Sequence, residues 1–320
     1  MKTMAPAIVT PLILFLQLAH IPLSASGRAA PGDSVALRSS FDTASVLRVE
    51  ETGLRLGSGD LREPTGVAVG SRGFIYVADA MAGKVFRYDR EGASLEFERS
   101  PDNAALYPID AADDESYILV LDYSRNKLLR YTHTGAYLDV LLSFDQFDRV
   151  RPVSFTVGAG GRIITADITN HTVSLWTPLF DTELTIGGFG RGEGRFIEPR
   201  EAVFLPDQGF VVVESGNRRL QYFSPSGQYE RIATPPAETP FISPRSVSVD
   251  DAGAVFVCDA QAGRIFVFDA GGLYVTDIHA YGGKAISPAA AAAGWNGALY
   301  VADLKSRSIL VYRVLHPREK

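Results

Sequence analysis

The sequence has a single cysteine, Cys258, and only five histidines among its 320 residues. One thiol excludes an internal disulfide and every metal site built from several cysteines. Basic residues are outnumbered, since 37 acidic against 31 basic side chains give a formal net charge of −6. This balance argues against non-specific nucleic-acid binding. After the first 27 residues, no apolar run approaches the ~20 residues that a membrane-spanning helix needs. The fold must therefore be held together by packing alone.

The first 27 residues have the features of a secretory signal peptide. One lysine precedes an apolar run centred on ILFLQLA, and small residues follow as far as Gly27. Cleavage after Gly27, with Ala25 at the other small position, fits this order. An uncleaved membrane anchor is the alternative, although Pro11 and His20 interrupt the run. We therefore expect an exported protein, either secreted or periplasmic, with no membrane span after cleavage.

A repeat of about forty-five residues runs through the rest of the chain. Six apolar segments end in an acid at spacings of 43, 45, 47, 45 and 44 residues: Asp79, Asp122, Asp167, Glu214, Asp259 and Asp303. Prolines open a shorter apolar strand at spacings of 44, 44, 47, 45 and 44 residues: Pro64, Pro108, Pro152, Pro199, Pro244 and Pro288. Two independent markers in phase indicate a repeat architecture, and this period is typical of solenoids and propellers.

Each repeat reads as four strands. The strand after the proline leads through a turn to a continuous apolar strand, which is the pattern of a strand buried on both faces. A four-residue connection, a third strand, a Gly-rich turn and a more polar fourth strand follow. No run of useful length has helical periodicity. The sequence therefore predicts an all-β fold, a six-bladed β-propeller of four-stranded antiparallel blades.

The chain ends just after the third strand of the sixth repeat, which therefore lacks its outermost strand. Residues 44–51 resemble the fourth strand that precedes the fourth repeat. We expect this N-terminal strand to close the last blade and leave no unpaired edge. The predicted organisation is a signal peptide at 1–27, a flexible segment at 28–43, the propeller at 44–314 and a tail at 315–320.

The repeats resemble NHL repeats. The matching segments include PTGVAVGSRGFIYVADAMAGKVFRYDREG, PREAVFLPDQGFVVVESGNRRLQYFSPSG and PRSVSVDDAGAVFVCDAQAGRIFVFDAGG. Only the third repeat has the Asn-His pair, Asn170 and His171, and the sixth replaces its first strand with five alanines. The resemblance implies a six-bladed propeller over residues 56–314. NHL propellers include protein-binding modules, RNA-binding modules and a few enzymes, so it leaves the activity open.

In four repeats, a base follows the repeat acid five residues later. The pairs are Asp79 and Lys84, Asp122 and Lys127, Glu214 and Arg219, and Asp259 and Arg264. Across a four-residue connection the two positions face each other, so we expect ion pairs that pin the hairpin mouth. Asp167 and Asp303 are expected to play the same structural role without that base.

Other motifs yield no catalytic assignment. The loop GGFGRGEG at 187–194 lacks the strand–loop–helix context and the Lys-Ser/Thr ending of a phosphate-binding loop, so we interpret it as a linker between blades. No Ser-His-Asp or Cys-His set can be assigned, and Cys258 stands at a position that other repeats fill with alanine or valine. We expect no catalytic residue, metal site or cofactor.

The most informative surface is the channel mouth, where the first strands begin. Side chains next to the prolines and in the connections after the second strands meet there, and the candidate binding residues are Arg200, Arg245, Arg151, Asp110, Glu201 and Arg218. Arg200 and Arg245 directly follow the prolines of neighbouring repeats. Two converging guanidinium groups could hold a carboxylate or phosphate. The opposing interpretation is that nearby acids neutralise both arginines as structural ion pairs.

These observations favour a secreted binding or scaffold module that uses its channel-mouth face. The expected partner is a protein or peptide, or an anionic ligand, and not a nucleic acid. The alternative is an extracytoplasmic enzyme, lyase-like or lactonase-like, that uses the central channel. A convergent metal-binding or acid–base set at the mouth would distinguish the enzyme, and the sequence alone does not reveal one.

Overall fold

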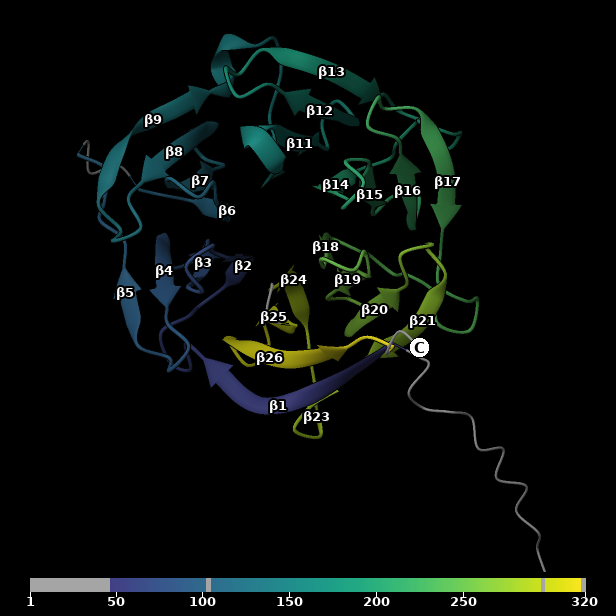
Figure 1. The fold of residues 1–320 in the computed structure, drawn as a ribbon. Helices are drawn as coiled ribbons and strands as arrows, with labels where there is room; N and C mark the ends of the chain where they lie inside the picture. Colours follow the sequence, from purple (N-terminus) through teal and green to yellow (C-terminus); the bar gives the residue numbers. More distant parts are fainter. Residues whose placement is uncertain (1–46, 102–104, 295–296, 318–320) are drawn as a thin grey trace, which may run out of the picture. The chain divides into compact units, whose positions relative to one another are not determined.

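In the computed structural model, which describes residues 47–101, 105–294 and 297–317, six four-stranded antiparallel sheets form a ring around a central axis (Figure 1). The predicted all-β, six-bladed propeller is therefore confirmed. Residues 1–27 and 28–43, assigned to a signal peptide and a flexible segment, lie outside the described residues, as do the last three residues of the predicted tail. No described helix has the length and apolar character needed to cross a membrane.

Each blade runs from an innermost strand beside the axis to an outermost strand at the rim. The innermost strands are β2 (Pro64–Val69), β6 (Pro108–Asp113), β10 (Ser154–Val157), β14 (Pro199–Phe204), β18 (Ser246–Val249) and β24 (Pro288–Ala293). The second strands are β3 (Ile75–Asp79), β7 (Ile118–Asp122), β11 (Ile163–Asp167), β15 (Phe210–Glu214), β19 (Val255–Asp259) and β25 (Ala298–Asp303). The third strands are β4 (Lys84–Tyr88), β8 (Lys127–Tyr131), β12 (Thr172–Trp176), β16 (Arg219–Phe223), β20 (Arg264–Phe268) and β26 (Ser308–Leu315). The outermost strands are β5 (Ser94–Glu96), β9 (Tyr137–Ser143), β13 (Thr182–Gly187), β17 (Tyr229–Ala233), β21 (Tyr274–Ile278) and β1 (Arg48–Leu56).

The short elements outside the blades are two 3-10 turns, at Phe144–Gln146 and Ala159–Gly161, and a small hairpin of β22 (Ala280–Tyr281) and β23 (Lys284–Ala285). The core of the fold lies between the blades. Every residue of β3, β7, β11, β15 and β19 is buried, because both faces of these strands pack against neighbouring sheets. Between blades 2 and 3, for example, Leu121 and Phe144 join Phe155 and Trp176 in one apolar cluster.

The N-terminal strand completes the sixth blade. β1 pairs antiparallel with β26, with Arg48 opposite Leu315 and Leu56 opposite Ile309, so two segments at opposite ends of the chain lie side by side (Figure 1). The predicted closure is therefore confirmed. The strand lies further along the chain than the expected 44–51, and a register shift follows Glu51, where Gly53 adopts a φ of 80°. Gly tolerates this left-handed conformation, so the strand can bend and still pair on both sides of the bulge.

The repeat acids are fully or almost fully buried. They accept hydrogen bonds from backbone N–H groups. The Asp79 carboxylate accepts from Arg62 (2.6 Å), Glu63 (3.0 Å) and Ala82 (2.9 Å). Asp259 repeats this pattern with Ile242, Ser243 and Ala262. Each acid thus fastens the segment before the innermost strand to the connection after the second strand.

Of the four ion pairs expected between a repeat acid and the base five residues later, only one forms. The partners do face each other, as in the pairs Asp79–Lys84, Asp122–Lys127 and Asp259–Arg264. In the described chain, however, Lys84 pairs with Glu96 on the outermost strand and Arg264 with Asp277. The ion-pair prediction was wrong for these three blades. Asp79 and Asp259 point to backbone N–H groups while Lys84 and Arg264 extend to the outermost strand, and Asp122 pairs with Arg125 in place of Lys127.

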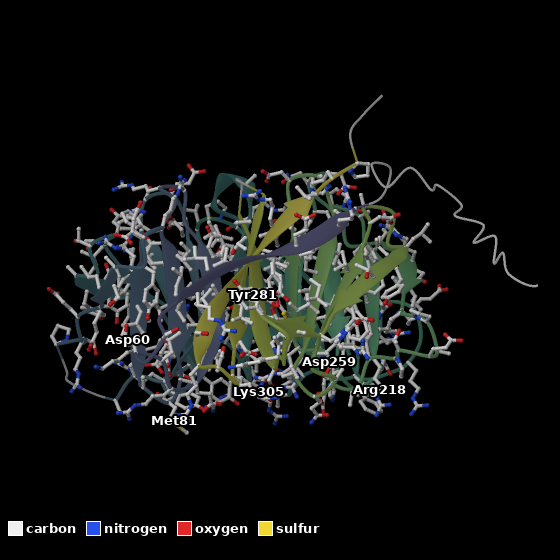
Figure 2. The ribbon with its side chains drawn as sticks, turned by 90° about the horizontal axis from the view of Figure 1, so that it is seen from below. Asp60, Met81, Arg218, Asp259, Tyr281 and Lys305 are labelled. Atoms are coloured by element: carbon white, nitrogen blue, oxygen red, sulfur yellow. The ribbon has the colours of Figure 1, made fainter. Side chains whose placement is uncertain are left out.

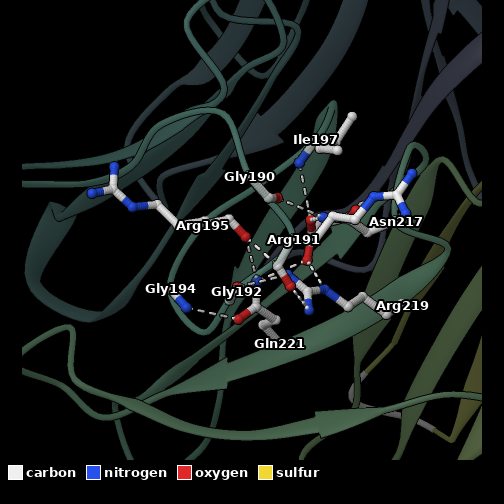
Figure 3. A network of polar contacts seen from close by, with 10 residues as sticks. Gly190, Arg191, Gly192, Gly194, Arg195, Ile197, Asn217, Arg219 and Gln221 are labelled. Carbon is white, nitrogen blue, oxygen red and sulfur yellow. Dashed lines mark hydrogen bonds and ion pairs between the residues drawn. The ribbon is translucent and has the colours of Figure 1, made fainter.

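Blade 4 carries the exception, in which Arg219 contacts Glu214 at 2.6 Å. The Arg219 guanidinium also donates to the carbonyl oxygens of Arg191, Gly192 and Arg195 (Figure 3). The Gln221 amide binds both the Arg195 carbonyl and the Glu214 carboxylate. Residues 188–198, which include most of the predicted linker, therefore connect β13 to β14 and are fastened through carbonyl groups to blade 4.

Candidate ligand-binding site at the channel mouth

The two residues after each repeat proline line a single pocket at one end of the channel, with a volume of about 230 Å³. The first positions are Thr65, Ile109, Val153, Arg200, Arg245 and Ala289. The second positions are Gly66, Asp110, Ser154, Glu201, Ser246 and Ala290. All six blades therefore contribute to one site, and the proline spacing in the sequence determines which side chains meet there.

Small residues on blades 6 and 1 leave room for the pocket. Ala289 and Ala290 present only methyl groups at positions where blade 4 has Arg200 and Glu201. Gly66 has no space for a side chain, since a Cβ there would lie 2.8 Å from the Cα of Asp110. Three of the five alanines of the sixth repeat, Ala289, Ala290 and Ala291, thus hollow out one side of the channel mouth.

Two guanidinium groups enter the pocket from neighbouring blades. Arg200 is partly engaged, because its Nε donates to the Ser215 hydroxyl and its Nη2 to the Glu198 carboxylate, both at 3.2 Å. The Arg245 guanidinium has no hydrogen-bond acceptor among the described residues. Arg245 is exposed as a whole, but desolvation of its guanidinium at the pocket, followed by the positive charge of Arg200, lowers its pKa, while Glu63 and Tyr107 act in the opposite direction. The two arginines thus repel each other and retain donors for an anion.

Two carboxylates form the floor of the pocket. Asp110 accepts hydrogen bonds from the backbone N–H groups of Ala111 (2.9 Å) and Phe155 (3.1 Å), and Glu201 accepts from Val247 (2.7 Å). Burial raises the pKa of Asp110 to about 7. Burial, followed by the charge of Asp110, raises the pKa of Glu201 to about 8. Both residues also line a second hollow of about 300 Å³ further along the channel, so they stand at its waist.

Four of the six candidate residues, Arg200, Arg245, Asp110 and Glu201, line this pocket, and the other two lie outside it. The Arg151 guanidinium stacks over the Tyr123 ring at 4.4 Å and donates to the Tyr123 carbonyl at 3.2 Å. Arg218 is exposed in the connection between β15 and β16. It lies along the same edge of the molecule as Met81 and Lys305 of other blades (Figure 2).

Tyr123 and Ile168 are among the pocket-lining residues that sequence reasoning missed. Each directly follows a repeat acid, Asp122 or Asp167. This fixed position after the acid is the signal that could have identified them.

Metal-binding groups do not gather in the described part of the chain, where no cluster of three or more His, Cys, Asp or Glu side chains could hold an ion. The buried His133 contacts Asp113 at 3.2 Å. His171 accepts a hydrogen bond from the backbone N–H of Glu198 through Nδ1, at 3.1 Å. Cys258 is fully buried, and burial raises the pKa of its thiol. The chemistry of the pocket therefore comes from its arginine, carboxylate, tyrosine and serine side chains.

Comparison with known proteins shows the fold and not the activity. No family model matches the chain. A curated relative, Protein brain tumor of Drosophila melanogaster, is 25% identical over 123 residues, which is 38% of this chain and 12% of that protein. This chain therefore spans a small part of that relative's length.

Among solved structures, virginiamycin B lyase from Staphylococcus aureus with quinupristin has a TM-score of 0.59 at 15% identity, covering 83% of this chain and 99% of that chain. A gluconolactonase from Xanthomonas campestris has a TM-score of 0.61 at 15% identity, covering 84% and 95%. A chain of a nidogen–laminin complex has a TM-score of 0.56 at 14% identity, covering 73% and 93%. The same propeller architecture thus occurs in a lyase, in a gluconolactonase and in a nidogen–laminin complex.

Proposed function

We propose that this protein is an exported NHL-type propeller that works as a binding module and holds an anionic group of its ligand between Arg200 and Arg245. The observation that carries the proposal is the Arg245 guanidinium, which lines the pocket beside a second guanidinium and has no acceptor among the described residues. A carboxylate or phosphate would relieve the repulsion and receive paired hydrogen bonds from the planar donors.

The face around the pocket supports binding to a protein or peptide. Large apolar side chains are exposed in the loops that surround the mouth: Met81 (63% exposed), Phe189 (71%), Tyr107 (43%) and Ile242 (41%). Exposed apolar and aromatic side chains around a polar pocket are common at protein-binding sites. The local similarity to Protein brain tumor and the repeat pattern support the NHL assignment. The signal-like N-terminus supports export, and N-terminal sequencing of the native protein tests this point.

A second candidate function, catalysis in the channel, is favoured by one observation. Asp110 and Glu201 lie at the floor of the same pocket with raised pKa values, and such a pair can exchange a proton near neutral pH. Turnover of simple lactones that depends on Glu201, abolished by Glu201→Gln while anion binding persists, would support this alternative. Absence of turnover together with retained binding supports the binding module.

The binding proposal is tested with two small anions, butanoate and methyl phosphate, titrated into the protein and followed by NMR. We expect saturable binding of at least one anion by the native protein and loss of binding in the double variant Arg200→Gln, Arg245→Gln. Arg218→Gln is the matched control, because it removes an exposed guanidinium that does not line the pocket. Equal binding by the native protein and the double variant would contradict the proposal.

A further inference from the structure

The mouth pocket contains one basic and one acidic side chain that have no polar partner in the described chain. Arg245 and Glu63 both line it, and within the described chain neither side chain has a hydrogen bond or ion pair. They nevertheless face the same space, since the Glu63 charge acts on the Arg245 guanidinium. Two opposite charges that line one pocket without a contact between them are both available to a ligand.

The other charged groups that line the pocket already have partners. Arg200 is held by Ser215 and Glu198, and the floor carboxylates of Asp110 and Glu201 accept backbone N–H groups. Glu63 is therefore the carboxylate of the pocket that is available to a cation. One further polar group is unpaired, since the Ser154 hydroxyl has no hydrogen-bond partner and the residue is only 6% exposed.

Neutral side chains occupy the wall between the two charges. Blade 6, which lies between the blades of Arg245 and Glu63, contributes the methyl groups of Ala289 and Ala290. The Tyr107 ring and Thr65 border the same space. These groups suit a short aliphatic chain better than a second ion, because they offer no counter-charge.

We infer that the pocket binds a short zwitterion, a ligand whose carboxylate is held by Arg245 and Arg200 and whose ammonium group is held by Glu63, with the chain between them against the alanines of blade 6. This inference rests on the proposed function, since it uses the same arginines, and it adds the ligand class. A free amino acid and the lysine at the end of a peptide share this chemistry.

The test compares three probes of matched size: 4-aminobutyrate, butanoate and butylamine. Glycine and 6-aminohexanoate extend the series in length, and N-acetyl-alanyl-lysine distinguishes a peptide end from a free amino acid. We expect one zwitterion of the series to bind the native protein at least about tenfold more tightly than the single-charge probes, because a charge-assisted hydrogen bond is gained at each end. Binding is measured by NMR titration.

Variants assign the two ends of the ligand. Glu63→Gln should remove the advantage of the zwitterion over butanoate without weakening butanoate binding, because it removes the ammonium partner and a negative charge from the same pocket. Glu193→Gln, an exposed carboxylate in the linker, is the matched control and should change neither. Arg245→Gln should weaken both ligands.

The outcomes separate the two proposals. Arginine-dependent binding of butanoate with no advantage for any zwitterion, or an advantage that survives Glu63→Gln, would overturn this inference and leave the anion site in place. If none of these probes binds the native protein at millimolar concentration and methyl phosphate does not bind either, both proposals are wrong.

Discussion

The carboxylate of Glu201 on blade 4 accepts a hydrogen bond of 2.7 Å from the backbone N–H of Val247 on blade 5. The same kind of hydrogen bond joins blades 2 and 3, where the Asp110 carboxylate accepts from the backbone N–H of Phe155 at 3.1 Å. In each case the second residue after a repeat proline binds the third residue after the next one. The polar residues at the channel waist therefore link blades as well as line the pocket, which explains why charged groups occur in so confined a place.

The raised pKa values of these carboxylates predict a pH dependence of stability. A folded-state pKa of about 7 for Asp110 and about 8 for Glu201 lies above the ordinary values of 3.8 and 4.5, so the folded state binds more protons than the unfolded state. The contribution of the pair to stability is then fully present at acidic pH and is lost as the pH rises to about 8. Thermal melting from about pH 5 to about pH 8 should show this fall, and Glu201→Gln should make it shallower. The same slope in Glu201→Gln and in the native protein would contradict the prediction, with Glu193→Gln as the control.

Leu56 is an apolar anchor of the N-terminal strand that closes the ring. Leu56 is 1% exposed and packs in the cluster between blades 6 and 1, whereas Leu54 on the same strand is 40% exposed. Leu56→Ala should lower the free energy of unfolding by about 2–5 kcal/mol, because it leaves a cavity in that cluster. Leu54→Ala should change it by less than about 0.5 kcal/mol. Urea denaturation measures both, and similar losses in the two variants would show that β1 is not anchored as described.

The linker before blade 4 provides a second matched pair. Arg219 contacts the fully buried Glu214 and three linker carbonyl groups, whereas its neighbour Arg218 is exposed and has no such contact. Arg219→Gln should cost about 3–5 kcal/mol of stability, because it leaves a buried carboxylate without its counter-ion. Arg218→Gln should be close to neutral in the same denaturation experiment. A neutral Arg219→Gln would mean that Gln221 and Asn217 alone compensate Glu214.

The sequence was sufficient to predict the six-bladed ring and the placement of Arg200 and Arg245 side by side at the channel mouth. Both residues directly follow a repeat proline, so the strand phase places them at the same height in the channel. The approach of Asp110 to Glu201 could not be predicted in this way, since it depends on the distance across the ring. The alanines of the sixth repeat looked like a loss of pattern in the sequence, yet in the structure they open the pocket.

Side-chain partners were the least predictable feature. Asp79 and Lys84 stand opposite each other, as the repeat implied, but Lys84 reaches Glu96 at 2.7 Å and Asp79 binds backbone N–H groups. Register is a property of the repeat, whereas partner choice depends on side-chain length and on which donors lack a partner nearby. The extra methylene of Glu214 relative to aspartate accompanies the one blade in which the expected ion pair forms.

The alanine wall predicts a way to block the pocket without disturbing the fold. Ala289 lines the pocket and belongs to none of the described apolar clusters between blades, so a larger side chain there would extend into the channel. Ala289→Leu should abolish butanoate binding by steric overlap and lower the free energy of unfolding by no more than about 1–3 kcal/mol, the usual cost of a larger side chain at a buried position. Thr156→Leu is the control, because Thr156 is half-buried and lines only the hollow further along the channel. NMR titration of both variants distinguishes the mouth pocket from the second hollow. If Thr156→Leu blocks butanoate binding and Ala289→Leu does not, the anion binds in the second hollow and the mouth pocket is not its site.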